Sequence, residues 1–184
     1  MKIVCLDAAT LGGDVDLSEI ASLGEFESYE MTEPAQTAQR LAGAGVVITN
    51  KVLITDEIMA QTALKLICVS ATGTNNVDMQ AAQARGIAVK NVAGYSTNSV
   101  VQQTFASLFA LTNALGYYAD YGSSGKWCES EIFTHIDAPI SEIYGKEFGV
   151  IGLGQIGVKL ARIAAAFGAN VRYYSTSGAN DNGE

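Results

Sequence analysis

Three glycines near the C-terminal end of the chain have the spacing of a loop that binds the phosphates of a dinucleotide. They are Gly152, Gly154 and Gly157 in the segment V-I-G-L-G-Q-I-G. The first glycine would permit a tight turn, the second would let the backbone approach a diphosphate, and the third would let helix and strand pack closely. The amides of Gln155 and Ile156 would then lie at a helix N-terminus, where the helix dipole favours an anion.

The segments around these glycines have the pattern of a strand–helix–strand unit. An apolar run, Phe148–Ile151, precedes the loop, a helical window follows at Gln155–Phe167, and a second run lies at Val171–Tyr174. Such units usually end the second strand with an acid that binds the adenosine ribose. Here Ser175 and Thr176 stand there, and hydroxyls also tolerate a 2′-phosphate. We therefore expect NAD and leave NADP open, and a glycine-rich turn without a ligand is the alternative interpretation.

Composition excludes several other classes of partner. The 184 residues carry 11 Lys and Arg against 19 Asp and Glu, a formal charge of −8, so nucleic acid and anionic membranes are not expected partners. No apolar run approaches the roughly 18 residues of a membrane span. The N-terminus meets Asp7 after four apolar residues, which does not fit a signal peptide. We expect a cytoplasmic protein.

Metal and hydrolase chemistry find little support. Cys5, Cys68 and Cys128 lack CxxC spacing and His135 is the only histidine, so no metal site is expected. His135 with Asp137 could form a general acid, but a surface or interface histidine explains it better. No GxSxG elbow occurs. The aromatic residues around His135 are interpreted as interface packing.

Short apolar runs alternate with helical windows along the chain, which predicts an α/β protein with a doubly wound parallel sheet. The predicted strands are Ile3–Leu6, Phe26–Met31, Val46–Thr49, Leu66–Val69, Ile87–Val89, Phe148–Ile151 and Val171–Tyr174. The predicted helices are Leu17–Leu23, Ala35–Ala44, Asp56–Ala63, Met79–Arg85, Asn98–Tyr118 and Gln155–Phe167.

The alternation breaks between residues 117 and 146, where the sequence is aromatic, polar and irregular. Five predicted strands precede this stretch and two follow it. We therefore expect residues 1–95 to form a nearly complete domain. Residues 96–184 would hold a crossing helix, an irregular connection and the beginning of a second domain.

Several linked motifs carry a family resemblance that extends over essentially all of the chain. Besides the glycine loop they are Leu64–Asp78, Gly94–Ala106 ("GYSTNSVVQQTFA"), Ser124–His135 ("SGKWCESEIFTH") and Tyr173–Gly178 ("YYSTSG"). Together they resemble the D-isomer-specific 2-hydroxyacid dehydrogenases, and most closely the glycerate dehydrogenase (hydroxypyruvate reductase) branch.

The resemblance implies a flavodoxin-like substrate domain followed by the first βαβ unit of a Rossmann coenzyme domain. Such enzymes transfer a hydride between nicotinamide and a small D-2-hydroxy acid or 2-keto acid of the glycerate, glyoxylate or lactate type. Carried over, the amides of Thr72 and Gly73 would bind the substrate carboxylate, although an ordinary strand–helix turn would also explain them. Thr97 and Val101 would face the nicotinamide. N-capping of the next helix suffices to explain Asn75, Asn76 and Asp78.

The family's catalytic Arg, Glu and His have no matching positions up to Glu184, so no catalytic residue is assigned and the chain alone is expected to be inactive. Family members pair through the coenzyme domain, which leaves a homodimer open. Two alternatives are a non-enzymatic nucleotide-binding or interaction module and a decayed remnant.

Overall fold

Residues 1–175 and 178 are described by the structure, a computed structural model. The chain divides into two units, Met1–Tyr95 and Ser96–Glu184, and each is described by itself. No helix among the described residues is both long enough and apolar enough to cross a membrane.

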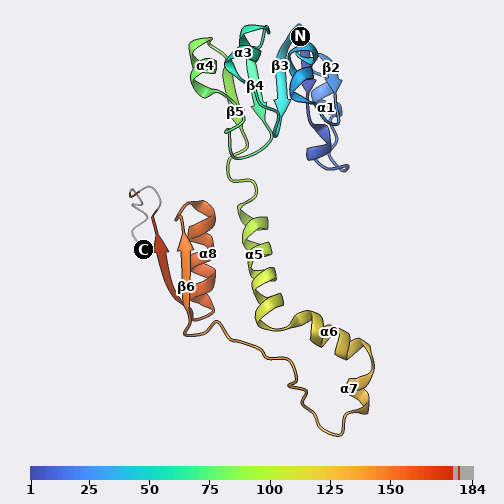
Figure 1. The fold of residues 1–184 in the computed structure, drawn as a ribbon, viewed down its shortest axis with the longest axis vertical. Coiled ribbons are helices and arrows are strands. Elements are labelled where there is room, and N and C mark those ends of the chain that lie inside the picture. The colour runs from blue at the N-terminus through green and yellow to red at the C-terminus, as the bar shows by residue number, and fades with distance from the viewer. Residues whose placement is uncertain (176–177, 179–184) are drawn as a thin grey trace. The chain divides into compact units, whose positions relative to one another are not determined.

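A five-stranded parallel sheet forms the centre of the first unit (Figure 1). Its order is β2-β1-β3-β4-β5, with every neighbouring pair parallel. This is the flavodoxin-like strand order, and it confirms the predicted doubly wound α/β fold. The strands are β1 Lys2–Cys5, β2 Glu25–Ser28, β3 Ala44–Thr49, β4 Leu66–Val69 and β5 Ala88–Asn91.

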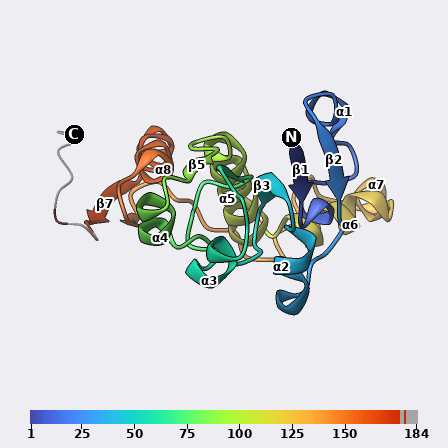
Figure 2. The ribbon, with the colours of Figure 1, turned by 90° about the horizontal axis from the view of Figure 1, so that it is seen from above.

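Short helices cover both faces of this sheet. In Figure 2, α2, α3 and α4 lie on one face and α1 lies on the other. The α-helices are α1 Ser18–Ala21, α2 Thr37–Arg40, α3 Asp56–Ala60 and α4 Met79–Ala84, and the 3-10 turns are η1 Ala8–Thr10 and η2 Pro34–Gln36.

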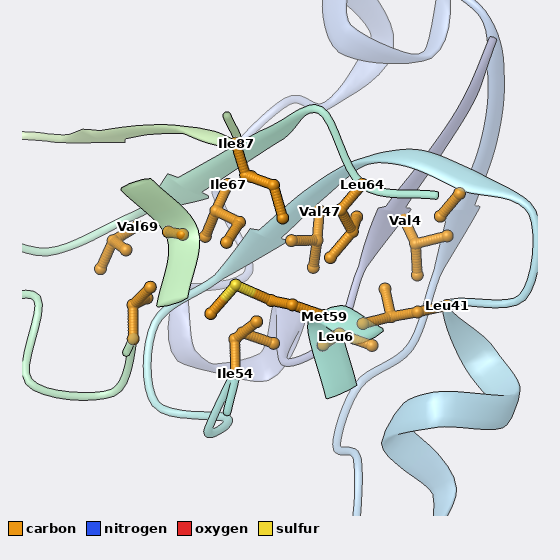
Figure 3. Close-up of a cluster of buried hydrophobic side chains, with 13 residues drawn as sticks. Val4, Leu6, Leu41, Val47, Ile54, Met59, Leu64, Ile67, Val69 and Ile87 are labelled. Carbon is orange, nitrogen blue, oxygen red and sulfur yellow. The ribbon is translucent and has the colours of Figure 1, made fainter. Parts of the chain in front are cut away.

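The core of the first unit lies between the sheet and the helices α2, α3 and α4. Figure 3 shows Val4, Val47 and Ile67 of the strands together with Leu41 and Met59, and all five are at most 2% exposed. Burying side chains of this size supplies about 1.5–3 kcal/mol each. The central strands are apolar without interruption because both of their faces are covered.

Asp78 caps the N-terminus of α4, as predicted, because its Oδ1 accepts a hydrogen bond from the amide of Ala81 at 3.0 Å. We expect Asp78→Ala to lower the free energy of unfolding by about 1 kcal/mol, since it leaves that amide without its acceptor. Urea unfolding would measure the loss. Gln83→Ala, an exposed change within the same helix, should leave stability unchanged, and equal stabilities of the two variants would contradict the capping role.

The second unit contains a parallel strand pair with a helix packed against it. Strand β6, Glu147–Ile151, pairs in parallel with β7, Asn170–Tyr174, and α8, Gln155–Ala166, connects them. This arrangement confirms the predicted βαβ unit. The remaining helices are α5 Thr97–Thr112, α6 Leu115–Ser123 and α7 Lys126–Glu129.

Helix α5 packs on α8 through an apolar cluster. Val101, Phe105 and Ala164 are its buried members. The Phe105 ring lies 6.3 Å from that of Phe148 and 6.0 Å from that of Phe167, measured between centroids. This cluster holds the start of α5 and the helix behind the glycine loop in one packed unit.

Several predicted elements have other boundaries, and three of them differ most. The helix predicted over Asn98–Tyr118 is interrupted, because α5 ends at Thr112 and Ala114 adopts the left-handed conformation with φ 48° before α6 begins. Helices α6 and α7 also occupy part of the stretch that was expected to be irregular. The strand predicted over Phe26–Met31 ends at Ser28, and the Ala35–Ala44 helix ends at Arg40 because Ala44 already pairs with β1.

Candidate functional site

The glycine loop turns sharply between β6 and α8. Gly152 has φ 86°, a left-handed conformation that glycine adopts without strain, and its amide donates to the carbonyl of Tyr174 at 2.9 Å. Gly154 is the N-cap of α8 and supplies no side chain to its first amides. The first amides of a helix have no intrahelical acceptor, so those of Gln155 and Ile156 are available to an anion.

Gly154 and Gly157 meet different surroundings. A Cβ at Gly157 would lie 2.1 Å from the carbonyl oxygen of Gly152, so packing alone requires glycine there. A Cβ at Gly154 would have no atom within 4 Å, so packing does not require glycine at that position. The open space beside Gly154 and the uncapped helix behind it fit a diphosphate.

A cavity of about 600 Å³ adjoins this helix start, and Lys159 is among the residues that line it. The Lys159 ammonium donates to Oδ1 of Asn98, which connects the second turn of α8 to the residue after Thr97. Lys159, one turn after Gln155, adds a positive charge close to the start of α8. Sequence analysis missed Lys159, and its only signal was a cation four residues into the helix.

The predicted nicotinamide-side residues differ in exposure. Thr97 is half-buried at the first position of α5, whereas Val101 is 2% exposed and belongs to the cluster between α5 and α8. A cofactor could reach Thr97 without disturbing the core. Contact of Val101 with a cofactor stays a prediction.

The residues predicted at the adenosine ribose lie at the end of β7. Ser175 is half-buried, and its Oγ accepts a hydrogen bond from the amide of Gly178 at 2.9 Å. Thr176 lies outside the described residues. The nearby base Arg172 is paired with Glu147 across the β6–β7 ladder.

The predicted carboxylate loop follows β4. Thr72 is tied to the end of β5, since its Oγ1 donates to the carbonyl of Val92 at 3.1 Å and its carbonyl accepts from Nδ2 of Asn91 at 2.6 Å. In the part of the chain that the structure describes, no residue accepts a hydrogen bond from the amide of Gly73. Gly73 lies in a cavity of about 260 Å³ that Lys51 also lines. A cavity lined by an exposed amide and by a lysine suits a carboxylate.

Asp7 fixes the turn that carries Lys51. The Asp7 side chain, in a residue only 3% exposed, accepts hydrogen bonds from the amides of Asn50, Lys51 and Val52 at 2.9, 2.7 and 3.3 Å. The hydroxyl of Thr49 donates to the same carboxylate at 3.3 Å. One carboxylate thus holds the end of β1 to the end of β3.

Asn76 holds the same turn from the other side. Its Nδ2 donates to the carbonyl of Val52 at 3.1 Å, and its own carbonyl accepts from the amide of Ile54 at 2.8 Å. The capping interpretation is therefore wrong for Asn76, because α4 takes Asp78 as its N-cap and the Asn76 amide is used for the turn.

His135 lies in an aromatic cluster. Its ring stacks on Tyr121 with centroids 3.6 Å apart, and its Nε2 is 2.8 Å from the hydroxyl of Tyr117. Asp137 is more distant, 3.9 Å from that nitrogen. These contacts account for His135 as a packing residue.

The described residues contain no group of three or more His, Cys, Asp or Glu side chains that could hold a metal ion. The three cysteines are free thiols. Burial raises the pKa of Cys5 and of Cys68 above the usual value, which disfavours their reactive thiolates. Cys128 is exposed.

Known proteins match this chain over most of its length. The sequence pattern described as "D-isomer specific 2-hydroxyacid dehydrogenase, catalytic domain" matches residues 8–180. The chain is 38% identical to a glycerate dehydrogenase of Methylorubrum extorquens, over 92% of the chain and 54% of that protein. It is 35% identical to a hydroxypyruvate reductase of Blautia hydrogenotrophica, over 95% of the chain and 56% of that protein.

A solved structure shares the fold. An acyclic imino acid reductase (Bsp5) in complex with NADPH and D-Arg superposes with a TM-score of 0.76 at 28% identity, over 100% of this chain and 59% of that one. The chain spans about half the length of the curated relatives it matches.

Proposed function

The chain belongs to the D-isomer specific 2-hydroxyacid dehydrogenase family, and we propose that it provides the part of such an oxidoreductase that binds the coenzyme diphosphate and the substrate carboxylate. The observation that carries the proposal is the uncapped N-terminus of α8 behind Gly154, where a side chain would have met only open space. Substrate domain and coenzyme domain would correspond to residues 1–95 and 96–184.

The coenzyme is a nicotinamide dinucleotide, and when bound it supplies or accepts the hydride. The amides of Gln155 and Ile156 would hold the diphosphate beside the glycines 152, 154 and 157, and Lys159 would add positive charge. Ser175 and Thr176 would contact the adenosine ribose, and Thr97 and Val101 would lie on the nicotinamide side.

NAD is favoured over NADP by the charges near Ser175. A 2′-phosphate needs a cation, but Arg172 is already paired with Glu147, and the sequence from Ser175 to Glu184 contains no Lys or Arg.

The substrate is a small 2-hydroxy or 2-keto acid of the glycerate, glyoxylate or lactate type. The exposed amides of the loop at Thr72 and Gly73 would receive its carboxylate, and the Lys51 ammonium at the same cavity would neutralise its charge. No residue of this chain is assigned as the acid that delivers the proton to the substrate oxygen, so the chain alone should bind but not turn over.

A second copy of the chain is the macromolecular partner we propose. Several large apolar side chains between residues 111 and 136 are exposed in the second unit, most of all Leu111 at 82%, Phe133 at 88% and Ile136 at 83%. Several exposed apolar side chains in one stretch favour contact with another protein chain.

NADH binding and turnover by the purified 184-residue chain test this function. We expect saturable binding of NADH, seen as enhanced nicotinamide fluorescence, weaker binding of NADPH, and no oxidation of NADH with hydroxypyruvate or glyoxylate. Full-length glycerate dehydrogenase of Methylorubrum extorquens is the positive control for turnover. Absence of NADH binding would contradict the coenzyme assignment, and measurable turnover would contradict the assignment of no catalytic acid.

A further inference from the structure

A cavity of about 450 Å³ lies in the first unit at the carboxyl ends of β1, β2 and β3. The strand order reverses between β1 and β3, because the chain passes from β1 outward to β2 and returns to β3 on the other side. Open parallel sheets bind ligands at such a switch point. The volume falls within the range of about 300–1,000 Å³ that is usual for small-molecule sites.

Apolar side chains form the walls of this switch-point cavity. They come from the segment after β2, from the turn after β3 and from α3, and are Met31, Pro34, Val52, Leu53 and Ile58. Met31 and Leu53 are 64% and 59% exposed, so they offer apolar surface that a ligand can bury.

The hydroxyl groups that line the cavity already donate within the protein. Thr10 donates to the carbonyl of Asp7 at 2.7 Å, Thr32 to the carbonyl of Leu6, Thr37 to that of Glu33 at 3.4 Å and Thr55 to the Glu57 carboxylate at 3.0 Å. These four threonines therefore offer a ligand no hydroxyl proton. A ligand with many hydrogen-bonding groups would lose more to desolvation than it gained.

Two charged residues also line the cavity, Asp7 and Lys51. The Asp7 carboxylate already accepts hydrogen bonds from the three amides and the hydroxyl described above, so it is not available to a ligand. Lys51 is exposed and forms no ion pair with any described residue. A single ammonium at an apolar cavity is complementary to a single negative charge on an apolar body.

We propose that the switch-point cavity binds a small monocarboxylate with an aliphatic chain, with the carboxylate at Lys51 and the chain against Met31, Pro34 and Ile58. This cavity shares Lys51 and Leu53 with the cavity at the proposed carboxylate loop, but its other walls lie after β1, after β2 and on α3, whereas that loop follows β4. The proposal does not depend on the dehydrogenase function.

Butanoate, pentanoate and hexanoate are the probes, measured against the full chain by amide NMR titration. Each added methylene should strengthen binding about fourfold, because burying one CH₂ in an apolar cavity contributes about 0.8 kcal/mol. The amides of residues 31–37 and 51–58 should shift. A flat series, or shifts confined to residues 72–76, would overturn the proposal.

Charge variants test the role of Lys51. Lys51→Met should weaken hexanoate binding at least fivefold and leave binding of 1-hexanol unchanged, since only the acid meets the ammonium. Met31→Glu should weaken hexanoate in the same way by placing a like charge at the cavity.

Leu23→Glu is the matched control for that second variant, because Leu23 is 74% exposed and precedes the opposite end of β2. Unchanged hexanoate binding in Lys51→Met, or equal weakening in Leu23→Glu, would contradict the assigned carboxylate position.

Discussion

Gly157→Ala is expected to lower the free energy of unfolding of the second unit by about 3 kcal/mol, the upper end of what overpacking usually costs. The added Cβ would stand 2.1 Å from the carbonyl oxygen of Gly152, a backbone atom that cannot rotate away. Relief requires α8 to move from β6, which would also misalign the amides of the glycine loop. Chemical denaturation followed by tyrosine and tryptophan fluorescence would measure the loss.

Gly122→Ala is the matched control, since a Cβ at that position of α6 would have no atom within 4 Å. Alanine should stabilise the helix there by about 0.5–1 kcal/mol. If Gly157→Ala proved as stable as Gly122→Ala, the close packing of α8 on the loop would be contradicted.

Gly154→Ala separates the binding role of the loop from its packing role. Its φ of −78° suits alanine and the space around its Cβ direction is open, so the variant should unfold like the unchanged protein. NADH affinity should nevertheless fall at least tenfold, because the methyl group would occupy the space proposed for the diphosphate. Unchanged NADH affinity would place the coenzyme elsewhere.

Asp7→Ala is expected to destabilise the first unit by about 3 kcal/mol or more. The substitution removes the only carboxylate that accepts from the turn after β3 among the described residues, and a hydrogen bond to a charged acceptor makes a net contribution of about 1.5–3 kcal/mol. For a unit of this size the loss corresponds to a decrease of Tm of roughly 12–24 °C, which calorimetry would record.

Two further variants show whether the loss comes from the hydrogen bonds of the Asp7 carboxylate. Thr49→Val removes one donor to the carboxylate and should destabilise by about 1 kcal/mol. Asp14→Ala changes an exposed acid in the same unit and should have little effect. If the Asp7→Ala and Asp14→Ala variants had the same Tm, water would be a sufficient substitute for the Asp7 carboxylate. The turn after β3 would then not depend on that carboxylate.

The strand–helix alternation and the glycine loop were predictable because their signals are local. Apolar runs such as Val46–Thr49 predict buried parallel strands, and the glycine spacing predicts the turn before α8. The break between α5 and α6 was not predictable. Ala114 has the best helix-forming residue type, yet it adopts the φ of 48° that glycine or asparagine usually takes at a helix end, so the residue type at the break does not indicate it.

Part of the candidate sites also depends on distant contacts. Asp7 and its donors at residues 49–52 are more than forty positions apart, so no spacing rule connects them. Lys51 and Gly73 come together only because β3 and β4 are neighbours. Asn76 has the residue type of a helix cap, but tertiary structure gives its side chain the carbonyl of Val52 as an acceptor instead.

The strand order has a consequence for the timing of folding during synthesis. β1 leaves the ribosome before the other four strands of its sheet, yet one of its neighbours, β3, ends only at Thr49. At about 5–20 residues per second, the apolar β1 waits about 2–9 s for that partner. The five-stranded sheet is complete once Asn91 has emerged, well before Gly152 is translated. The first unit can therefore begin to fold before the glycine loop exists, and one edge of β1 stays unpaired until Thr49 has been synthesised.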